Sequence, residues 1–310
     1  MKTSVALCTY NGERFLRKQL DSILAQTVPV DEIIICDDHS TDGTPAILLD
    51  YQKKFPDLFK IYSNDTTLKS VKNFEKAISL CTHDIIFLSD QDDIWLPFKV
   101  ETFLNIFKDN TDIHVISSSA YLIDDDDEKI EKNTIWNIFD FFKNKNISYN
   151  YFEIFNLIGN IATGAHMAIR RSMVSEIHPF PEQHYHHDEW IALVSSRKNS
   201  FYFTSEKTAF YRIHELQQVG SVFLDDRKNT DSQLIQRFNP YNSNDSLRLL
   251  KRRFLILKKK KKKILSIQDY HNNLTFAEML KSIEDYEIYL KNNLKKTRPV
   301  AYQLFKLLYF

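Results

Sequence analysis

The chain has 310 residues, of which 43% are hydrophobic, and its 41 basic and 41 acidic side chains give no formal net charge. This composition is typical of a globular protein with one large domain, or one domain and an appendage, and it excludes a disordered chain. A neutral chain with one local basic run is also a poor match for a protein whose main partner is nucleic acid.

The three cysteines, Cys8, Cys36 and Cys81, lie in or beside apolar, strand-like segments. Their odd number and these settings predict reduced thiols and a cytosolic chain. No secretion signal is visible before residue 10, and no apolar run approaches the ~20 residues of a membrane-spanning helix. We therefore expect a cytoplasmic protein that is at most peripheral on the inner membrane face.

Strand-like and helix-like segments alternate through the first 90 residues. Four apolar runs are typical of buried strands: residues 4–8, 32–36, 59–62 and 85–88. Three segments between them have apolar residues at helical spacing: 15–24, 44–51 and 71–81. Alternation at this spacing predicts an α/β fold, with a mainly parallel sheet flanked by helices on both faces.

Three of these strands end in polar residues: Thr9 to Gly12, Asp37-Asp38 and Asp90 to Asp93. The carboxyl ends of parallel strands meet at one edge of the sheet, where ligands bind in open α/β folds. The sequence therefore predicts a ligand site at this edge.

The middle of the chain is less regular. A strand is expected at 113–123, and the aromatic-rich segment 135–155 is interpreted as a cover or an acceptor-side segment rather than as core sheet. Three further strands are expected at 164–169, 201–203 and 208–211, and a helix is expected at 189–194.

The character of the chain changes near residue 221. A helix is predicted at 245–267, with one apolar face formed by Leu250, Phe254, Leu257, Ile264 and Leu265. The lysine run 258–263 covers its other sides. Such a helix suits a membrane surface, or it is a solvated helix that packs on the main domain or a partner. We predict a catalytic domain at 1–225 and a helical, basic C-terminal region at 226–310.

The acidic residues after the fourth strand, Asp90, Asp92 and Asp93, carry a chemical signal of their own. Neighbouring carboxylates repel one another, and a divalent cation relieves that repulsion. Mg²⁺ in particular is held by one or two carboxylates together with substrate phosphates. The alternative is an acidic turn that caps the helix following Pro97.

Five motifs occur in a fixed order: Thr9-Tyr10-Asn11-Gly12, Asp37-Asp38, Asp90-Gln91-Asp92-Asp93-Ile94-Trp95, His187-Asp188-Glu189-Trp190 and Tyr211-Arg212-Ile213-His214. Together they resemble the bacterial family 2 glycosyltransferases of the GT-A fold, which are inverting and use nucleotide-sugars. The resemblance covers roughly residues 1–220. The Asp-Gln-Asp-Asp-Ile-Trp motif is similar to the branch with rhamnosyltransferases that build surface polysaccharides.

The resemblance implies a nucleotide-sugar site formed by Thr9, Tyr10, Glu13, Asp38, Lys72, Asp90 and Arg212. Asp38 would accept a hydrogen bond from the imide N–H of a pyrimidine, and an aromatic side chain such as Tyr10 gives a base a stacking face. The glycine that the family usually has before Lys72 is missing here. Without the resemblance, Tyr10 and Asp38 read as a turn aromatic and a helix cap.

The resemblance also implies a site for Mg²⁺ or Mn²⁺, with Asp92 as direct ligand and His214 completing its shell. The ion would neutralise charge on the departing nucleoside diphosphate. Asp188 would be the general base that takes the proton of the acceptor hydroxyl, with Glu189 as the competing candidate. Gly164 would allow close approach of the backbone to the acceptor.

A different metal is suggested by His184, His186 and His187, which lie near Asp188 and could serve a zinc hydrolase. Their spacing does not fit a His-Glu-x-x-His helix. Asp188 alone also reads as the cap of the helix that follows it.

We expect an inverting, metal-dependent glycosyltransferase that moves a sugar from a UDP- or dTDP-sugar, such as dTDP-rhamnose, to a surface-polysaccharide or lipopolysaccharide acceptor. Its expected partners are the donor, a lipid-linked glycan acceptor and the inner membrane face, with no nucleic acid. The alternatives are a nucleotide-sugar hydrolase on the same fold and a basic module that binds a membrane or nucleic acid.

Overall fold

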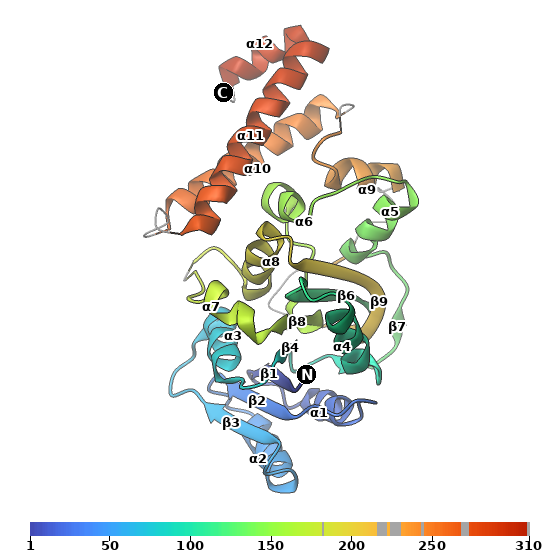
Figure 1. The fold of residues 1–310 in the computed structure, drawn as a ribbon, viewed down its shortest axis with the longest axis vertical. Coiled ribbons are helices and arrows are strands. Elements are labelled where there is room, and N and C mark those ends of the chain that lie inside the picture. Colours follow the sequence, from blue (N-terminus) through green and yellow to red (C-terminus); the bar gives the residue numbers. More distant parts are fainter. Residues whose placement is uncertain (182, 216–221, 224–230, 243–244, 268–272, 309–310) are drawn as a thin grey trace. The chain divides into compact units, whose positions relative to one another are not determined.

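The computed structural model describes residues 1–181, 183–215, 222–223, 231–242, 245–267 and 273–308 (Figure 1). The chain forms two compact units. The first is Met1–Phe139 with Ala162–Leu224, and the second is Asp140–Ile161 with Asp225–Phe310. The assignment of separate functions to residues 1–225 and 226–310 stays a prediction.

The first unit contains a nine-stranded sheet with the order β3-β2-β1-β4-β8-β6-β9-β5, and β7 pairs with β6. The strands are β1 (Thr3–Thr9), β2 (Glu32–Asp37), β3 (Phe59–Ser63), β4 (Ile85–Ser89), β5 (Ile94–Trp95), β6 (Val115–Ile123), β7 (Lys129–Ile130), β8 (Met167–Arg170) and β9 (Phe201–Arg212). β1 to β4 are mutually parallel, β8 is antiparallel to β4 and β6, and β6 and β9 are parallel. The predicted α/β class with a mixed, mainly parallel sheet is confirmed.

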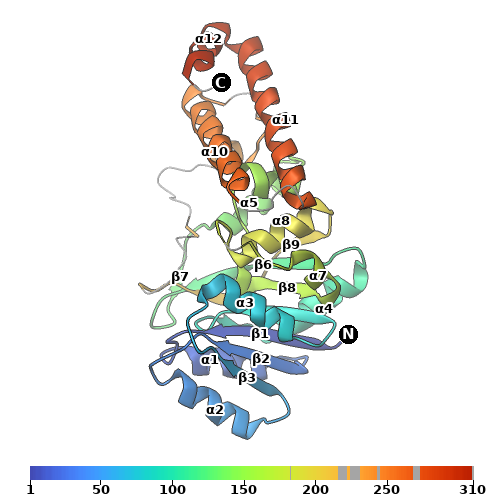
Figure 2. The same ribbon diagram turned by 90° about the vertical axis from the view of Figure 1, so that its left-hand side faces the viewer.

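Four helices connect the strands of the first half: α1 (Leu16–Leu24), α2 (Thr44–Lys54), α3 (Lys69–Leu80) and α4 (Lys99–Asp109). In α1 the buried Leu16, Leu20 and Ile23 follow the predicted helical spacing. Figure 2 shows α3 and α2 on opposite sides of β1 to β3. This follows from the strand order: the chain moves outward from β1 to β3 and then returns past β1 to β4. The direction of winding therefore reverses between β1 and β4.

Five further elements of the first unit are described: η1 (Ile135–Asn137), η3 (Gly164–His166), η4 (Arg171–Met173), α7 (Val174–Ile177) and α8 (His187–Arg197). The strand predicted at 164–169 is shorter than expected, because its first three residues form the η3 turn and only β8 pairs with the sheet. All three cysteines are free and buried, as predicted.

The two strands predicted at 201–203 and 208–211 are wrong, since both belong to the single strand β9. The polar residues 205–207 suggested a break. Instead, the register against β6 shifts there, from Ser118 paired with Thr204 to Ser119 paired with Lys207. A bulge of this kind absorbs extra residues without ending the strand.

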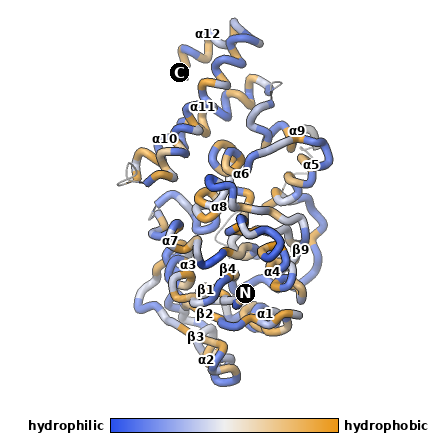
Figure 3. Tube along the Cα trace, viewed as in Figure 1, coloured by the Kyte–Doolittle hydropathy of each residue, from blue (hydrophilic) through white to orange (hydrophobic). Residues whose placement is uncertain are grey.

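The second unit is helical and includes α6 (Tyr151–Glu153), η2 (Ile154–Ile158), α9 (Asp231–Phe238), α10 (Leu247–Leu265), α11 (Leu274–Thr297) and α12 (Pro299–Leu308), while α5 (Ile138–Asn144) crosses the boundary between the units. Hydrophobic and hydrophilic residues interchange along α10 to α12 (Figure 3). The predicted face of α10 is buried at Leu250, Phe254, Leu257 and Ile264, but Leu265 is 46% exposed because it lies in the last turn.

Two contacts show how the second unit is held together. A buried ion pair joins Arg253 Nε to Asp245 Oδ2 at 2.6 Å, and the rings of Phe254 and Phe305 lie 6.0 Å apart. Among the described helices of the chain, none is long and apolar enough to cross a bilayer.

Candidate active site

Loops after β1, β2 and β4 lie side by side at the carboxyl edge of the sheet. Thr9 pairs with Asp37 at the ends of β1 and β2, and Leu7 pairs with Ser89 near the ends of β1 and β4. The gap between β1 and β4 is where the winding direction reverses, which is the usual ligand position in open α/β sheets. The structure thus brings together the three polar clusters that the sequence placed at one edge.

Asp38 is buried and organises the loop before α3. Its Oδ1 accepts hydrogen bonds from Asn64 Nδ2 at 2.8 Å and from the N–H of Leu68 at 2.7 Å, and its Oδ2 accepts from the N–H of Lys69 at 2.8 Å. The N–H of Asp38 donates to the carbonyl of Thr9 at 2.8 Å. After these three bonds the carboxylate still has a lone pair that could accept a further hydrogen bond. The contact with a pyrimidine stays a prediction.

The loop after β1 is fixed through its backbone and exposes its aromatic ring. Thr9 is buried and its hydroxyl donates to Asp37 Oδ1 at 2.6 Å, whereas Tyr10 is 44% exposed. Glu13 accepts a hydrogen bond from the N–H of Gly43. These contacts hold the loop to the segment after β2 and leave the ring of Tyr10 open to a ligand.

Lys72, on α3, has partners of its own. Its Nζ lies 2.7 Å from Glu75 Oε2 and donates to the carbonyl of Phe180 at 3.3 Å. Its predicted place in the nucleotide site stays a prediction.

The segment after β9 returns to the acidic loop after β4. His214 Nε2 lies 2.9 Å from Asp92 Oδ2, and the ring of His214 packs 5.4 Å from that of Phe15. Arg212 is fully buried: its Nε donates to the carbonyl of Asp92 at 2.8 Å, and its NH1 donates to the carbonyl of Asp124 at 2.6 Å. The guanidinium therefore holds the backbone of the acidic loop from the buried side. The predicted contact of Arg212 with a diphosphate stays a prediction.

Asp90 is the first residue of the acidic loop that follows β4. Burial raises the pKa of Asp90 to about 8, and the negative charges of Asp92 and Asp188 act in the same direction, while Lys99 opposes them. Two carboxylates from segments almost 100 residues apart thus influence one side chain. Asp90, Asp92 and Asp188 consequently belong to one electrostatic environment.

Asp188 lies in the first turn of α8, and its carboxylate binds the turn at Gly164. Asp188 Oδ2 accepts from the N–H of Gly164 at 3.3 Å, and Oδ1 accepts from the N–H of Glu189 at 2.6 Å. Burial raises the pKa of Asp188, and these hydrogen bonds partly offset the increase. The capping residue of α8 is His186, so the alternative reading of Asp188 as the cap is wrong.

Gly164 is required by its neighbour His187. A Cβ at Gly164 would lie 2.2 Å from His187 Nε2. The His187 ring is buried and stacks on Phe74 with 3.9 Å between ring centroids. Burial lowers the pKa of His187 to about 3, so this imidazole is neutral near pH 7.

Two buried residues near the site, Lys99 and His166, were not singled out from the sequence, and they form a cluster with Asp93, a member of the predicted acidic run. The N–H of Arg212 donates to Asp93 Oδ1 at 3.0 Å, and Asp93 Oδ2 lies 3.7 Å from His166 Nε2. Lys99 Nζ donates to the carbonyl of Ala165 at 2.8 Å. Burial lowers the pKa of Lys99 to about 7, while Asp93 and Asp90 act in the opposite direction. Only the run of acidic residues hinted at this cluster, because Lys99 and His166 lie in otherwise ordinary segments.

The carboxylate of Asp92 suits a hard divalent ion that takes its other ligands from a substrate. Among the described residues, no group of three or more His, Cys, Asp or Glu side chains is placed to hold a metal. Asp92 and His214 nevertheless bring one carboxylate and one imidazole within hydrogen-bond distance. Mg²⁺ is held by one or two carboxylates when phosphates and water supply the rest, so Asp92 suits this role, and the imidazole of His214 would be a softer additional ligand. The zinc alternative would use His187 as a ligand. The ring of His187 instead packs against the ring of Phe74.

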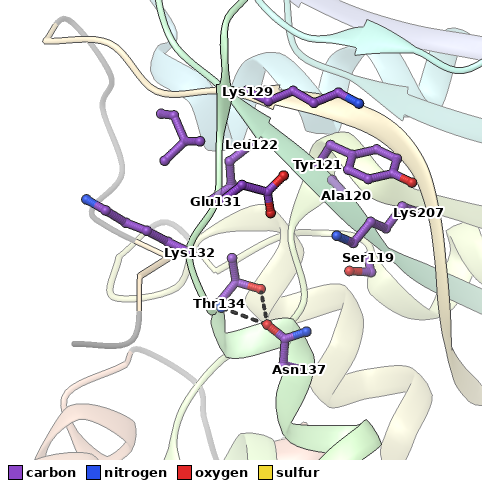
Figure 4. Close-up of a pocket in the computed structure, with 11 residues that line it drawn as sticks. Ser119, Ala120, Tyr121, Leu122, Lys129, Glu131, Lys132, Thr134, Asn137 and Lys207 are labelled. Atoms are coloured by element: carbon purple, nitrogen blue, oxygen red, sulfur yellow. Dashed lines mark hydrogen bonds between the residues drawn. The ribbon is translucent and has the colours of Figure 1, made fainter. Parts of the chain in front are cut away.

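A separate small pocket lies at β6, β7 and β9, and none of its lining residues belongs to these loops (Figure 4). Its lining includes Tyr121, Lys129, Glu131 and Lys207. The ammonium groups of Lys129 and Lys207 lie 5.0 and 4.3 Å from the ring centroid of Tyr121. These cation–π contacts account for the position of both lysines.

Comparison with known proteins identifies the class. Residues 4–177 match the family described as "Glycosyl transferase family 2", and this match covers more than half of the chain. The protein therefore belongs to glycosyl transferase family 2, as the resemblance implied.

Its relatives include the dTDP-rhamnosyl transferase RfbG of Shigella flexneri, 28% identical over 69% of this chain and 74% of RfbG. The putative glycosyltransferase EpsE of Bacillus subtilis is 32% identical over 40% of this chain, and the match spans 45% of the length of EpsE.

Solved structures share the fold at low sequence identity. The Staphylococcus aureus protein TarS (residues 1–349, with UDP-GlcNAc) matches with a TM-score of 0.54 and 16% identity, over 98% of this chain and 78% of that one. The mannosyltransferase PcManGT of Pyrobaculum calidifontis, with GDP-Man and Mn²⁺, matches with a TM-score of 0.54 and 14% identity, over 99% and 78%. The fold is therefore of the GT-A type.

Proposed function

We propose that this protein transfers a sugar from a UDP- or dTDP-sugar to a hydroxyl group of a glycan acceptor, with inversion at the anomeric carbon and Asp188 as the general base. The observation that carries the proposal is the shared environment of Asp90, Asp92 and Asp188. It couples the candidate metal loop electrostatically to the candidate base, at the end of the sheet where a donor would bind.

Asp92 and His214 would hold Mg²⁺ or Mn²⁺, and the ion would stabilise the charge that develops on the leaving nucleoside diphosphate. Arg212 fixes the backbone of Asp92 from the buried side, and the N–H of Arg212 fixes Asp93. These contacts fix the backbone that carries the carboxylate of Asp92, and His214 contacts that carboxylate directly, before any ligand arrives. Such preorganisation is the main way in which an enzyme site stabilises developing charge.

Asp188 would take the proton of the acceptor hydroxyl as that oxygen attacks the anomeric carbon. The C–O bond to the diphosphate breaks as the new glycosidic bond forms, so a single displacement inverts the centre. A raised pKa makes Asp188 a better base than an exposed aspartate. Its hydrogen bond from Gly164 fixes the carboxylate relative to the η3 turn.

The donor that we favour is dTDP-rhamnose. The relative RfbG is named as a dTDP-rhamnosyl transferase and aligns with 69% of this chain. Uracil and thymine both present an imide N–H to a carboxylate such as Asp38, so UDP-sugars are tested beside dTDP-sugars.

The acceptor that we propose is a lipid-linked surface glycan, approached at the inner face of the cytoplasmic membrane. Within the second unit, α10 exposes Lys258, Lys259 and Lys262, and α12 exposes Leu304, Leu307 and Leu308. Basic residues and exposed leucines together suit an anionic lipid surface.

Sedimentation with anionic vesicles tests this membrane association. Charge reversal of Lys258, Lys259 and Lys262 should weaken binding. The control is charge reversal of Lys53 and Lys54, exposed lysines of α2 in the first unit. Equal binding by both variants would contradict the membrane role.

A donor screen with the purified protein tests the activity. Release of nucleoside diphosphate is measured for UDP- and dTDP-sugars, with Mn²⁺ and with or without a glycan acceptor. The proposal predicts release that depends on the acceptor, together with a glycosylated product. Equal release without the acceptor would identify a hydrolase instead.

A further inference from the structure

The side chain of Gln91 pairs with the backbone of Tyr10. The N–H of Tyr10 donates to Gln91 Oε1 at 2.8 Å, and Gln91 Nε2 donates to the carbonyl of Tyr10 at 3.0 Å. Because the amide of Gln91 both accepts from and donates to the backbone of one residue, its two hydrogen bonds resemble those between neighbouring β-strands. It prolongs the contact between β1 and β4 beyond the last paired residues, Leu7 and Ser89.

A glycine makes room for this clamp. A Cβ at Gly12 would lie 2.2 Å from Gln91 Oε1. The N–H of Gly12 donates to the hydroxyl of Thr44 at 2.8 Å, which holds the other side of the loop. The loop after β1 therefore packs between the start of α2 and the side chain of Gln91. Any residue larger than glycine at position 12 would displace the Gln91 amide.

The two ends of the clamp belong to two different predicted binding functions. Tyr10, whose ring is exposed, belongs to the candidate nucleoside loop. Gln91 stands between Asp90 and Asp92 in the candidate metal loop. A ligand that fixes one loop therefore also restricts the other through the amide of Gln91.

We propose that Gln91 is a positioning residue that couples nucleoside binding at the Tyr10 loop to divalent-cation binding at Asp92. The proposal rests on the proposed function, because that function assigns the two ligands to the two loops. Coupling of this kind is reciprocal: each ligand raises the affinity for the other by the same factor.

The test uses a nucleoside without phosphate, so that the cation cannot bridge the two ligands directly. The dissociation constant of Mn²⁺ is measured by titration calorimetry without nucleoside and with saturating uridine or thymidine. For the wild-type protein we expect binding at least about fivefold tighter with nucleoside, the lower end of ordinary coupling factors. In Gln91→Met, which keeps the length but loses both hydrogen bonds, the factor should fall to about one.

The matched control is Gln52→Met on α2, which should keep the wild-type factor. Gln91→Glu still accepts from the N–H of Tyr10 but cannot donate to its carbonyl, so its factor should lie below that of the wild type. If Gln91→Met does not fold, the coupling factor of Gln91→Glu is compared with that of the wild type instead. A structural role alone would lower the melting temperature without changing the factor.

Two results separate this proposal from the proposed function. If the wild type binds both ligands independently, or if Gln91→Met and Gln91→Glu keep the wild-type factor, the coupling role is wrong and the proposed function stands. If the wild type binds neither Mn²⁺ nor a nucleoside, the coupling role is also wrong, while the donor screen, in which the diphosphate is present, decides the proposed function separately.

Discussion

His214 Nε2 lies 2.9 Å from Asp92 Oδ2, although the two residues are 122 positions apart in the sequence. The contact joins the segment that follows β9 to the acidic loop that follows β4. Because a carboxylate and an imidazole would share a divalent ion at this distance, the pair is the structural basis for the metal site that we propose.

Replacing His214 by alanine should weaken Mn²⁺ binding by roughly 10- to 100-fold, the usual cost of losing a group that orients or completes a metal site. The affinity is measured by titration calorimetry on the purified protein. The control is His83→Ala, a histidine that precedes β4 at the opposite end of the strand. Unchanged affinity in His214→Ala would remove this residue from the metal site.

Replacing Asp188 by asparagine should reduce sugar transfer by roughly 10²- to 10⁴-fold, since it removes the base and keeps the size of the side chain. Donor binding, measured by thermal shift with Mn²⁺, should stay close to that of the wild type. Glu189→Gln is the control because Glu189 is the competing candidate. Loss of transfer in Glu189→Gln, with full transfer in Asp188→Asn, would reverse the assignment.

The rate of transfer should also depend on pH through Asp188. The carboxylate acts as a base only when it is ionised, and burial raises its pKa above the usual aspartate value. The rate should therefore rise with pH through this raised pKa and then level off. A transfer rate that falls as the pH rises from 5 to 7 would contradict this role.

Replacing Gly164 by alanine should lower the free energy of unfolding by about 1–3 kcal/mol, the ordinary cost of overpacking. The added Cβ would lie 2.2 Å from the ring of the buried His187. Denaturant unfolding measures the change. Gly159→Ala is the control, since no atom lies within 4 Å of the position that its Cβ would occupy. A Gly164→Ala protein as stable as this control would show that His187 moves aside freely.

Acidification should destabilise the protein through His187. Its pKa is about 3 in the folded chain and about 6.5 when unfolded, so the unfolded state binds the proton more readily. The stability that His187 contributes is complete above pH 6.5 and is lost as the pH falls toward 3. Denaturant unfolding from pH 7 to 4 should show a shallower loss in His187→Gln than in the wild type. If the free energy of unfolding fell equally with pH in both proteins, the ring of His187 would be exposed to water rather than buried.

The sequence predicted the sheet and its ligand edge because β1 to β4 are short, mostly apolar runs, and three of them, β1, β2 and β4, end in polar residues. Local pattern is sufficient where both faces of a strand are covered by helices. It failed at β9, because the polar residues 205–207 resemble a turn while pairing with β6 continues through a bulge. A bulge depends on the partner strand, which no local pattern records.

The candidate site was predictable only in part. Asp92 and Asp188 stand in motifs that mark them, and in the folded chain the charges of both act on Asp90. Lys99 and His166 carry no such mark, since their burial depends on how the η3 turn packs against the start of α4. The two hydrogen bonds of Gln91 likewise appear only when β1 and β4 are adjacent.

The central claim is that a cation held at Asp92 contributes to binding a nucleotide-sugar. The most direct test compares the unfolding temperatures of the wild type and Asp92→Asn with UDP- or dTDP-sugars, each with and without Mn²⁺. The account predicts that at least one of these donors stabilises the wild type strongly only when Mn²⁺ is present, and that Asp92→Asn loses this increase while unfolding normally without ligand. Equal Mn²⁺-dependent stabilisation of both proteins, or none by any donor in the wild type, would contradict it.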